Sequence, residues 1–188
     1  MAPSFRDPRS QPLRLTDDVA DRARRVKMIL MDVDGVLTDR RIIYQAQLDE
    51  AKAFDAHDGV ALKLAQRAGL LTGIITGRLS IATSRRAREL KMVEFHQKVF
   101  TKIEVLDSIL KARRLSPESI CFIGDDLVDI PVLKKVGFAA APSDARAEAQ
   151  RVAHFVTASE GGRGAVRDVV DFILKVQGRW AKVAGGYL

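Results

Sequence analysis

The chain has 188 residues, 47% hydrophobic and 29% charged, which suits one domain with a sizeable core. Its net charge of +7 comes from dispersed basic residues, and aromatic residues make up only 6%, so no nucleic-acid surface is indicated. No apolar run reaches the roughly 18 residues of a membrane span, and no secretory signal is visible. The single cysteine, Cys121, excludes a disulfide framework within the chain. We therefore expect a cytoplasmic protein with no nucleic-acid partner and no membrane.

Short apolar runs alternate with helical patterns along most of the chain. Residues 1–25 are expected to form an N-terminal extension with a short helix near its end, and residues 26–178 a single domain. Strands are expected at 28–33, 71–76, 119–124, 137–141 and 154–157, and helices at 59–67, 102–114, 126–136 and 165–176. The first three strands are apolar on both faces, as parallel strands covered by helices are. The pattern predicts an α/β fold with a Rossmann-like, doubly wound parallel sheet.

One insertion interrupts this alternation directly after the first strand. Residues 41–44 and 51–54 flank the polar stretch 45–50, which predicts a β-hairpin over residues 40–54. Its position suggests a flap over the end of the first strand. The last segment, 179–188, is small and Gly-containing, and we expect it to be a mobile C-terminal tail.

Polar residues gather where the predicted strands end. In open α/β sheets, ligands collect outside the carboxyl ends of the strands. Four segments place charged or hydroxyl-bearing side chains at that edge. These segments contain Asp32, Asp34, Thr76, Gly77, Arg78, Lys102, Asp125, Asp126 and Asp129. A dense group of acids cannot stay ionised without a compensating cation, and oxygen ligands favour Mg²⁺ over Zn²⁺.

Metal-linked chemistry on a phosphate accounts for these residue types. Asp32 is suited to attack phosphorus as a carboxylate nucleophile, and Asp34 to act as general acid and then general base. Thr76 can hold phosphoryl oxygens, and Lys102 can neutralise charge on the nucleophile and the phosphate. Asp125, with Asp32, can hold Mg²⁺. Hydrolysis of phosphate monoesters is very slow without a catalyst, so several charged groups are needed together.

At these residues the sequence resembles the haloacid dehalogenase superfamily. D-V-D-G-V-L-T-D, I-I-T-G-R, the lysine at 102 and G-D-D-L-V-D match its four motifs in order and spacing. The resemblance implies that Asp32 is both nucleophile and metal ligand and that Asp34 binds the metal through its backbone carbonyl. It also implies that Asp125 is a further metal ligand. A closer resemblance, to the sugar-acid phosphatases of this superfamily, implies that the chain uses Mg²⁺, lacks a large cap domain and forms a homotetramer.

Two further stretches resemble the superfamily's sugar-acid phosphatases, and more closely those acting on 3-deoxy-D-manno-octulosonate 8-phosphate in lipopolysaccharide precursor synthesis. They are F-D-A-H-D-G at 54–59 and G-G-R-G-A-V-R at 161–167. The resemblance places in the substrate pocket Asp55, Ala56, His57, Asp58, Gly59, Lys63, Gly77, Arg78, Arg86 and Arg163. Arg163 is the candidate for the sugar-acid carboxylate, which arginine can bind bidentately. The chain departs from the family pattern at His57, Ala61 and Lys98, so a nine-carbon sugar acid remains the alternative substrate.

Other interpretations of the same residues stay open. Asp126 can simply cap the helix that follows it, and Asp129 can support the metal ligands without binding the metal. Arg86 can belong to a solvated helix face. A phospho-acceptor signalling module also combines acids, Mg²⁺, Thr and Lys on a doubly wound sheet, and an inactive interaction protein could keep the fold. The closely spaced pair Asp32 and Asp34 and the predicted flap favour a small-molecule phosphatase.

Overall fold

A computed structural model describes residues 17–45 and 50–186 of the chain. Within these ranges a six-stranded parallel sheet has the order β5–β4–β1–β6–β7–β8. The strands are β1 (Met28–Met31), β4 (Leu71–Ile75), β5 (Glu94–His96), β6 (Ile120–Ile123), β7 (Phe138–Ala141) and β8 (Phe155–Val156). The fold class predicted from the alternating pattern is therefore confirmed.

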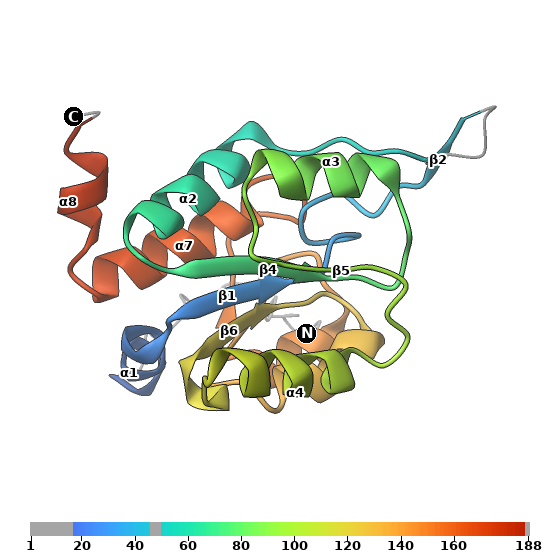
Figure 1. Cartoon of the computed structure of the whole chain (residues 1–188). Coiled ribbons are helices and arrows are strands. Elements are labelled where there is room, and N and C mark those ends of the chain that lie inside the picture. The colour runs from blue at the N-terminus through green and yellow to red at the C-terminus, as the bar shows by residue number, and fades with distance from the viewer. Residues whose placement is uncertain (1–16, 46–49, 187–188) are drawn as a thin grey trace, which may run out of the picture.

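Helices cover both faces of the sheet. They are α1 (Asp17–Arg25), α2 (Ala56–Arg67), α3 (Ile81–Glu89), α4 (Lys102–Arg113), α5 (Ile130–Leu133), α6 (Ala147–Val152), α7 (Ala165–Val176) and α8 (Trp180–Ala184). Helices α2, α3 and α7 pack over one face and α4 to α6 over the other, each side burying its own apolar cluster (Figure 1). None of the helices in the described part of the chain is both long and apolar enough to cross a bilayer.

Strand β1 lies in the middle of the sheet and determines where a ligand can bind. All four of its side chains are buried, and it pairs with β4 on one side and β6 on the other. The chain runs from β1 outward to β4 and β5, and later returns beside β1 to build β6 to β8. Such a reversal opens a crevice at the carboxyl end of the central strand. Asp32 and Asp34 follow β1 at this point.

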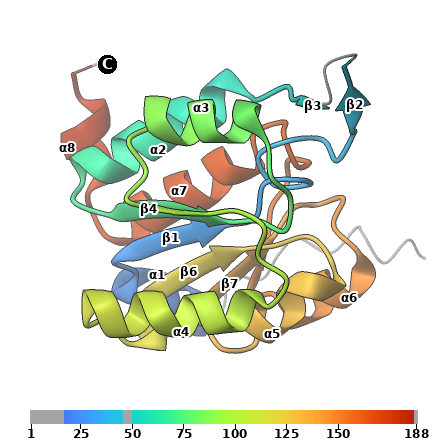
Figure 2. The ribbon, with the colours of Figure 1, turned by 45° about the vertical axis from the view of Figure 1, so that its right-hand side comes forward.

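The predicted hairpin is present between β1 and α2. Strands β2 (Ile43–Tyr44) and β3 (Glu50–Ala51) pair antiparallel, and the hairpin projects on the side toward which the strands of the sheet point (Figure 2). Within the described residues the insertion holds no large cap domain. The expected tip at residues 46–49 lies outside the described residues, as do most of the N-terminal extension and residues 187–188. Part of the expected tail forms α8, at the end of the molecule opposite the hairpin (Figure 1).

The predicted strands of the main sheet are confirmed to within two residues, but several other elements differ from expectation. The helix expected at 126–136 is a 3₁₀ turn at Leu127–Asp129 followed by the short α5, whose first turn contains a proline. Strand β5 is a three-residue edge strand with polar ends, so no apolar run marks it. Helix α3 buries only Thr83 and Ala87, and α6 is six residues long, so neither shows a clear apolar stripe.

Two glycines let backbone segments approach the end of β1 closely. Gly35 has φ +110°, and a Cβ atom there would lie 2.0 Å from an Asp125 carboxylate oxygen. A Cβ atom at Gly161 would lie 1.9 Å from the Gly35 carbonyl oxygen. The loop of residues 161–164, called the glycine loop below, therefore rests directly on the loop after β1. A side chain at Gly161 would push these two loops apart, and one at Gly35 would displace the Asp125 carboxylate.

Candidate active site

A buried lysine joins two of the carboxylates. Lys102 opens α4, and its Nζ lies 2.8 Å from Asp32 Oδ1 and 2.7 Å from Asp129 Oδ1. Only 3% of the lysine side chain is exposed. Burial opposes its charged form, but the two carboxylates outweigh burial and raise the pKa of Lys102 above its usual value. The lysine is therefore held as a cation beside the proposed nucleophile.

The carboxylates of Asp32, Asp125 and Asp129 form a buried cluster in which one oxygen of each lies within 4.8 Å of the others. Burial, reinforced by the charges of Asp32 and Asp129, raises the pKa of Asp125 to about 8. Burial likewise raises the pKa of Asp32, against the attraction of Lys102. Such a cluster favours a cation, and its oxygen-only donors fit a hard divalent metal ion.

Asp129 has both oxygens occupied by other partners. One pairs with Lys102, and the other accepts hydrogen bonds from the backbone N–H groups of Asp125 (3.0 Å) and Asp126 (3.4 Å). Asp129 therefore holds Lys102 and the backbone at Asp125, and its support of the metal ligands stays a prediction. Asp126 is exposed and accepts a hydrogen bond from the Leu127 N–H, so it caps the 3₁₀ turn. Together they fix the backbone that carries Asp125.

The Asp34 side chain faces a second buried lysine instead of the acid cluster. Its Oδ1 is ion-paired with Lys52, which follows β3 at the base of the hairpin. Its Oδ2 is buried and has no hydrogen-bond partner among the described residues. Sequence reasoning did not identify Lys52 or its neighbour Glu50. The sequence did offer one indication of their role. Glu50 and Lys52 are two residues apart, which places both charges on one face of an extended strand.

A cavity of about 260 Å³ opens at these strand ends. Most of the predicted reaction residues line it, and its wall consists of Asp32, Asp34, Thr76, Gly77, Arg78, Val99, Phe100, Lys102 and Val128. Thr76 is buried and ends β4, where its N–H donates to the His96 carbonyl. Arg78 is ion-paired with Glu50, and this contact raises the pKa of Arg78 and lowers that of Glu50. The cavity can hold a phosphoryl group between Asp32, Asp34 and Lys102.

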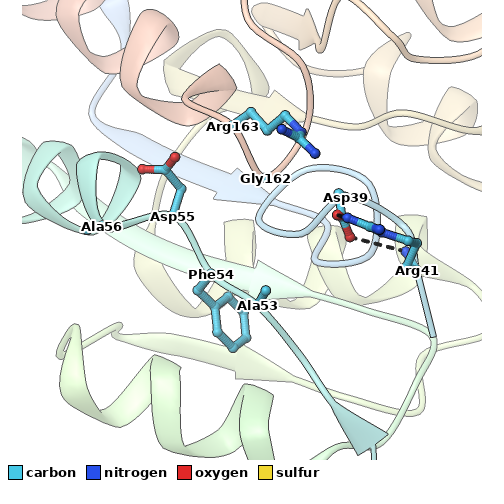
Figure 3. Close-up of a pocket in the computed structure, with 8 residues that line it drawn as sticks. All are labelled: Asp39, Arg41, Ala53, Phe54, Asp55, Ala56, Gly162 and Arg163. Carbon is cyan, nitrogen blue, oxygen red and sulfur yellow. Dashed lines mark hydrogen bonds and ion pairs between the residues drawn. The ribbon is translucent and has the colours of Figure 1, made fainter. Parts of the chain in front are cut away.

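A second cavity, of about 470 Å³, lies between the segment that joins β3 to α2 and the glycine loop (Figure 3). Three predicted substrate residues, Asp55, Ala56 and Arg163, line it together with Asp39 and Arg41. The Asp55 side chain caps α2 by accepting hydrogen bonds from two backbone N–H groups. The Arg163 guanidinium extends from the glycine loop toward the ion pair of Asp39 and Arg41 (Figure 3). The cavity is thus polar, with two arginines and two acids, and because Arg41 is paired with Asp39, Arg163 is the cation that an anionic group would meet there.

Several predicted substrate residues lie outside both cavities. Lys63 is exposed and lines a separate cavity with residues of α2 and α3. Arg86 points inward, donates to the Asp55 carbonyl at 2.9 Å and lies over the Phe54 ring. The Arg86 guanidinium packs closely against α2, because a Cβ atom at Gly59 would lie 2.3 Å from an Arg86 nitrogen. In this chain Arg86 therefore braces the start of α2.

The remaining two predicted residues differ in burial. Asp58 is buried and accepts a hydrogen bond from the Arg167 N–H, which joins α2 to the start of α7. Burial raises the pKa of Asp58 to about 6. The His57 side chain is exposed and lines a hollow with Arg163 and Arg167. The Asp58 side chain thus stabilises the contact between α2 and α7, whereas the His57 side chain is accessible to a ligand.

Comparisons with known proteins agree with this geometry. Residues 82–169 match the haloacid dehalogenase-like hydrolases. The 3-deoxy-D-manno-octulosonate 8-phosphate phosphatase of Yersinia pestis is 36% identical over 171 residues, 91% of each chain. The Escherichia coli K12 enzyme of the same name is 35% identical over 168 residues, 89% of each chain.

Solved structures give the same result. The enzyme of that name from Moraxella catarrhalis, in complex with magnesium ion, phosphate ion and a KDO molecule, superposes with a TM-score of 0.89. It is 32% identical, and the match covers 92% of this chain and 99% of that one. The cobalt-bound Haemophilus influenzae phosphatase gives a TM-score of 0.81 at 31% identity, covering 84% of this chain and 92% of that one.

The fold and the acid cluster thus define a haloacid dehalogenase-like hydrolase of the phosphatase class, rather than a signalling module. Within that class, the chain belongs to the family of the 3-deoxy-D-manno-octulosonate 8-phosphate phosphatases.

The acid cluster generates a prediction about Asp125. Without metal, the folded protein keeps a proton on Asp125 up to about pH 8, whereas the unfolded chain loses it near about pH 4. The unfolded state then binds fewer protons, so the free energy of unfolding falls as pH rises between these values. Asp125→Asn should therefore stabilise the metal-free protein, increasingly from pH 5 to pH 8, by up to about 1.4 kcal/mol per pH unit. Denaturant unfolding in chelator would measure this.

Asp125→Asn should also lose most of the stabilisation that a metal ion gives the wild type. Mg²⁺ should raise the Tm of the wild type, and Asp125→Asn should lose most of that gain. Asp107→Asn, an exposed acid paired with Lys135, is the control and should change neither measurement. A full Mg²⁺ response in Asp125→Asn would contradict the placement of the metal.

Proposed function

We propose that this phosphatase hydrolyses the phosphate monoester of 3-deoxy-D-manno-octulosonate 8-phosphate with Mg²⁺ as its cation. The observation that carries the proposal is the ion pair of Lys102 with Asp32 beside the acid cluster, in a cavity sized for a phosphoryl group. The family membership and the magnesium, phosphate and KDO in the Moraxella structure support the substrate and the metal.

In the first step, an Asp32 carboxylate oxygen attacks phosphorus. The new bond joins Asp32 to the phosphoryl group, and the bond between phosphorus and the sugar oxygen breaks. The leaving oxygen takes a proton from the Asp34 carboxyl group and departs as the free sugar alcohol. The buried Lys102 cation offsets negative charge on Asp32 and the phosphoryl oxygens, and Thr76 at the end of β4 can bind those oxygens.

In the second step, the aspartyl-phosphate is hydrolysed. The Asp34 carboxylate removes a proton from a water molecule, whose oxygen attacks phosphorus as the bond to Asp32 breaks. Inorganic phosphate leaves, and both aspartates return to their starting protonation states. Asp32, Asp125 and the Asp34 carbonyl would hold Mg²⁺, which would neutralise charge on the transferring phosphoryl group.

The second cavity is the proposed site for the sugar-acid end of the substrate. Arg163 would bind the carboxylate, since its guanidinium can donate two parallel hydrogen bonds. The side chain is exposed and only loosely paired, at 3.7 Å from Glu160, so it is available to a ligand. His57, in the adjoining hollow, can contact the same end of the substrate.

We propose that residues 26–178 form the catalytic unit and that the protein works as a cytoplasmic homotetramer.

Large apolar side chains stay exposed near the site, and a neighbouring copy would cover them. They include Tyr44 on the hairpin, Leu79, Ile81 and Phe100, the last 93% exposed. The lone buried cysteine suits a reducing compartment. Light scattering and sedimentation would test the assembly.

The substrate assignment predicts fast phosphate release from 3-deoxy-D-manno-octulosonate 8-phosphate only when Mg²⁺ is present. Asp32→Asn removes the nucleophile and should lower kcat by roughly 10⁴-fold or more. The nine-carbon analogue and ordinary sugar phosphates would be assayed in parallel. Faster turnover of the nine-carbon ester would keep the mechanism and replace the substrate, and unchanged kcat in Asp32→Asn would overturn the mechanism.

The covalent intermediate should accumulate when its hydrolysis is slowed. p-Nitrophenyl phosphate has a leaving group that departs without a proton, so Asp34→Asn should still form the aspartyl-phosphate from it. The same variant lacks the base that activates water, so acid quenching should trap phosphate covalently on the protein. Asp32→Asn should trap none, and equal trapping in the two variants would exclude Asp32 as the nucleophile.

Arg163→Ala should weaken binding of the sugar acid selectively. A charged hydrogen-bonded contact contributes about 1.5–3 kcal/mol, so KM for the sugar-acid phosphate should rise roughly 10- to 100-fold. KM for p-nitrophenyl phosphate, which has no carboxylate, should change less than about threefold. Equal increases in KM for the two substrates would show that Arg163 does not bind the carboxylate.

A further inference from the structure

We propose that Lys52 is a positioning residue, which holds the Asp34 carboxylate in the orientation that delivers a proton to the leaving oxygen. The inference rests on the proposed phosphatase mechanism but adds a residue that lies outside the superfamily motifs. Its basis is the arrangement of charges between the hairpin base and the ends of β1 and β4.

The Lys52 side chain is buried, which is unfavourable for a lysine unless acids pair with its charge. Only 2% of its side chain is exposed, and the residue directly follows β3 at the base of the hairpin. Taking an ammonium group out of water costs several kcal/mol unless acids pair with it. Its Nζ has two such partners, Asp34 Oδ1 in direct contact and Glu50 Oε2 at 3.5 Å. The lysine is thus built into the protein as a partner for the Asp34 side chain.

The contact leaves the two oxygens of Asp34 unequal. Oδ1 is held by Lys52, whereas Oδ2 is buried and has no hydrogen-bond partner among the described residues. Asp34 also lines the cavity that holds Asp32 and Lys102. Lys52 therefore anchors the carboxyl group at Oδ1, while the Asp34 side chain, 17% exposed, remains in the cavity wall, where it can exchange a proton with substrate. Without the anchor, the side chain could rotate and the carboxyl group would lose its fixed orientation in the cavity wall.

The lysine is itself held from the far side. Glu50 lies two residues before it and is ion-paired with Arg78, which follows β4. Charges of alternating sign therefore run from Asp34 through Lys52 and Glu50 to Arg78. This row ties the hairpin base to the ends of two neighbouring strands, so the position of Lys52 is fixed by the fold and not by one contact.

The test compares kcat/KM for two esters in Lys52→Gln, Lys52→Arg and the wild type. The value of kcat/KM covers the steps through departure of the leaving group, in which Asp34 acts as acid. For the sugar-acid phosphate, Lys52→Gln should lower kcat/KM by about 100-fold, in the range of a general-acid contribution. For p-nitrophenyl phosphate the loss should be under about tenfold. Lys52→Arg keeps the charge and should restore at least tenfold of the loss.

Two further variants separate positioning from folding. If Lys52 acts through Asp34, then adding Lys52→Gln to Asp34→Asn should lower the residual activity by less than about threefold. Lys135→Gln breaks an exposed lysine–aspartate pair and should leave activity unchanged. Thermal unfolding of each variant, with Mg²⁺ titrated, would show that the fold and the metal site are intact.

Equal losses on the two esters, full additivity with Asp34→Asn, or wild-type activity in Lys52→Gln would each overturn the proposal. Failure of the proposed substrate would be visible separately, because the wild type would then release nitrophenol but no phosphate from the sugar acid. In that case the leaving-group comparison would be run on whichever alkyl phosphate the wild type hydrolyses.

Discussion

Repulsion among carboxylates at the end of β1 is the constraint on which the rest of the site depends. Asp32, Asp34, Asp125 and Asp129 meet there, and two buried lysines, Lys52 and Lys102, lie among them. Arg40 also lies 3.9 Å from Asp125, but the cluster of Asp32, Asp125 and Asp129 contains a single buried lysine, and a divalent cation would offset the repulsion that remains. Each lysine contacts one member of the Asp32–Asp34 pair, so neighbouring acids receive separate partners.

The sheet order makes this meeting possible. Because β1 lies between β4 and β6, segments that are far apart in sequence end at the same edge. Close backbone contacts then fix the loops, since Gly35 makes room for the Asp125 carboxylate and Gly161 for the Gly35 carbonyl. The rigidity of these contacts matters for phosphoryl transfer, in which catalysis is largely positioning and electrostatic stabilisation.

The base of the hairpin is joined to the active site by charged side chains. Its second strand and the residue after it supply Glu50 and Lys52, which reach the general acid and Arg78. Charged contacts at its base also explain how a two-stranded ribbon, which is marginally stable by itself, is held in place.

The sequence by itself determined the fold class and predicted which polar residues gather at the carboxyl edge of the sheet. Apolar runs mark β1, β4 and β6 because buried parallel strands need them, and acids after such runs indicate a site at the carboxyl edge. Strand β5 and helix α3 lacked an apolar pattern and were not predicted. Only the tertiary structure decided that Lys52 faces Asp34, that Arg86 turns inward and that Lys63 lies elsewhere. The direction of a long charged side chain depends on partners distant in sequence, which local patterns do not record.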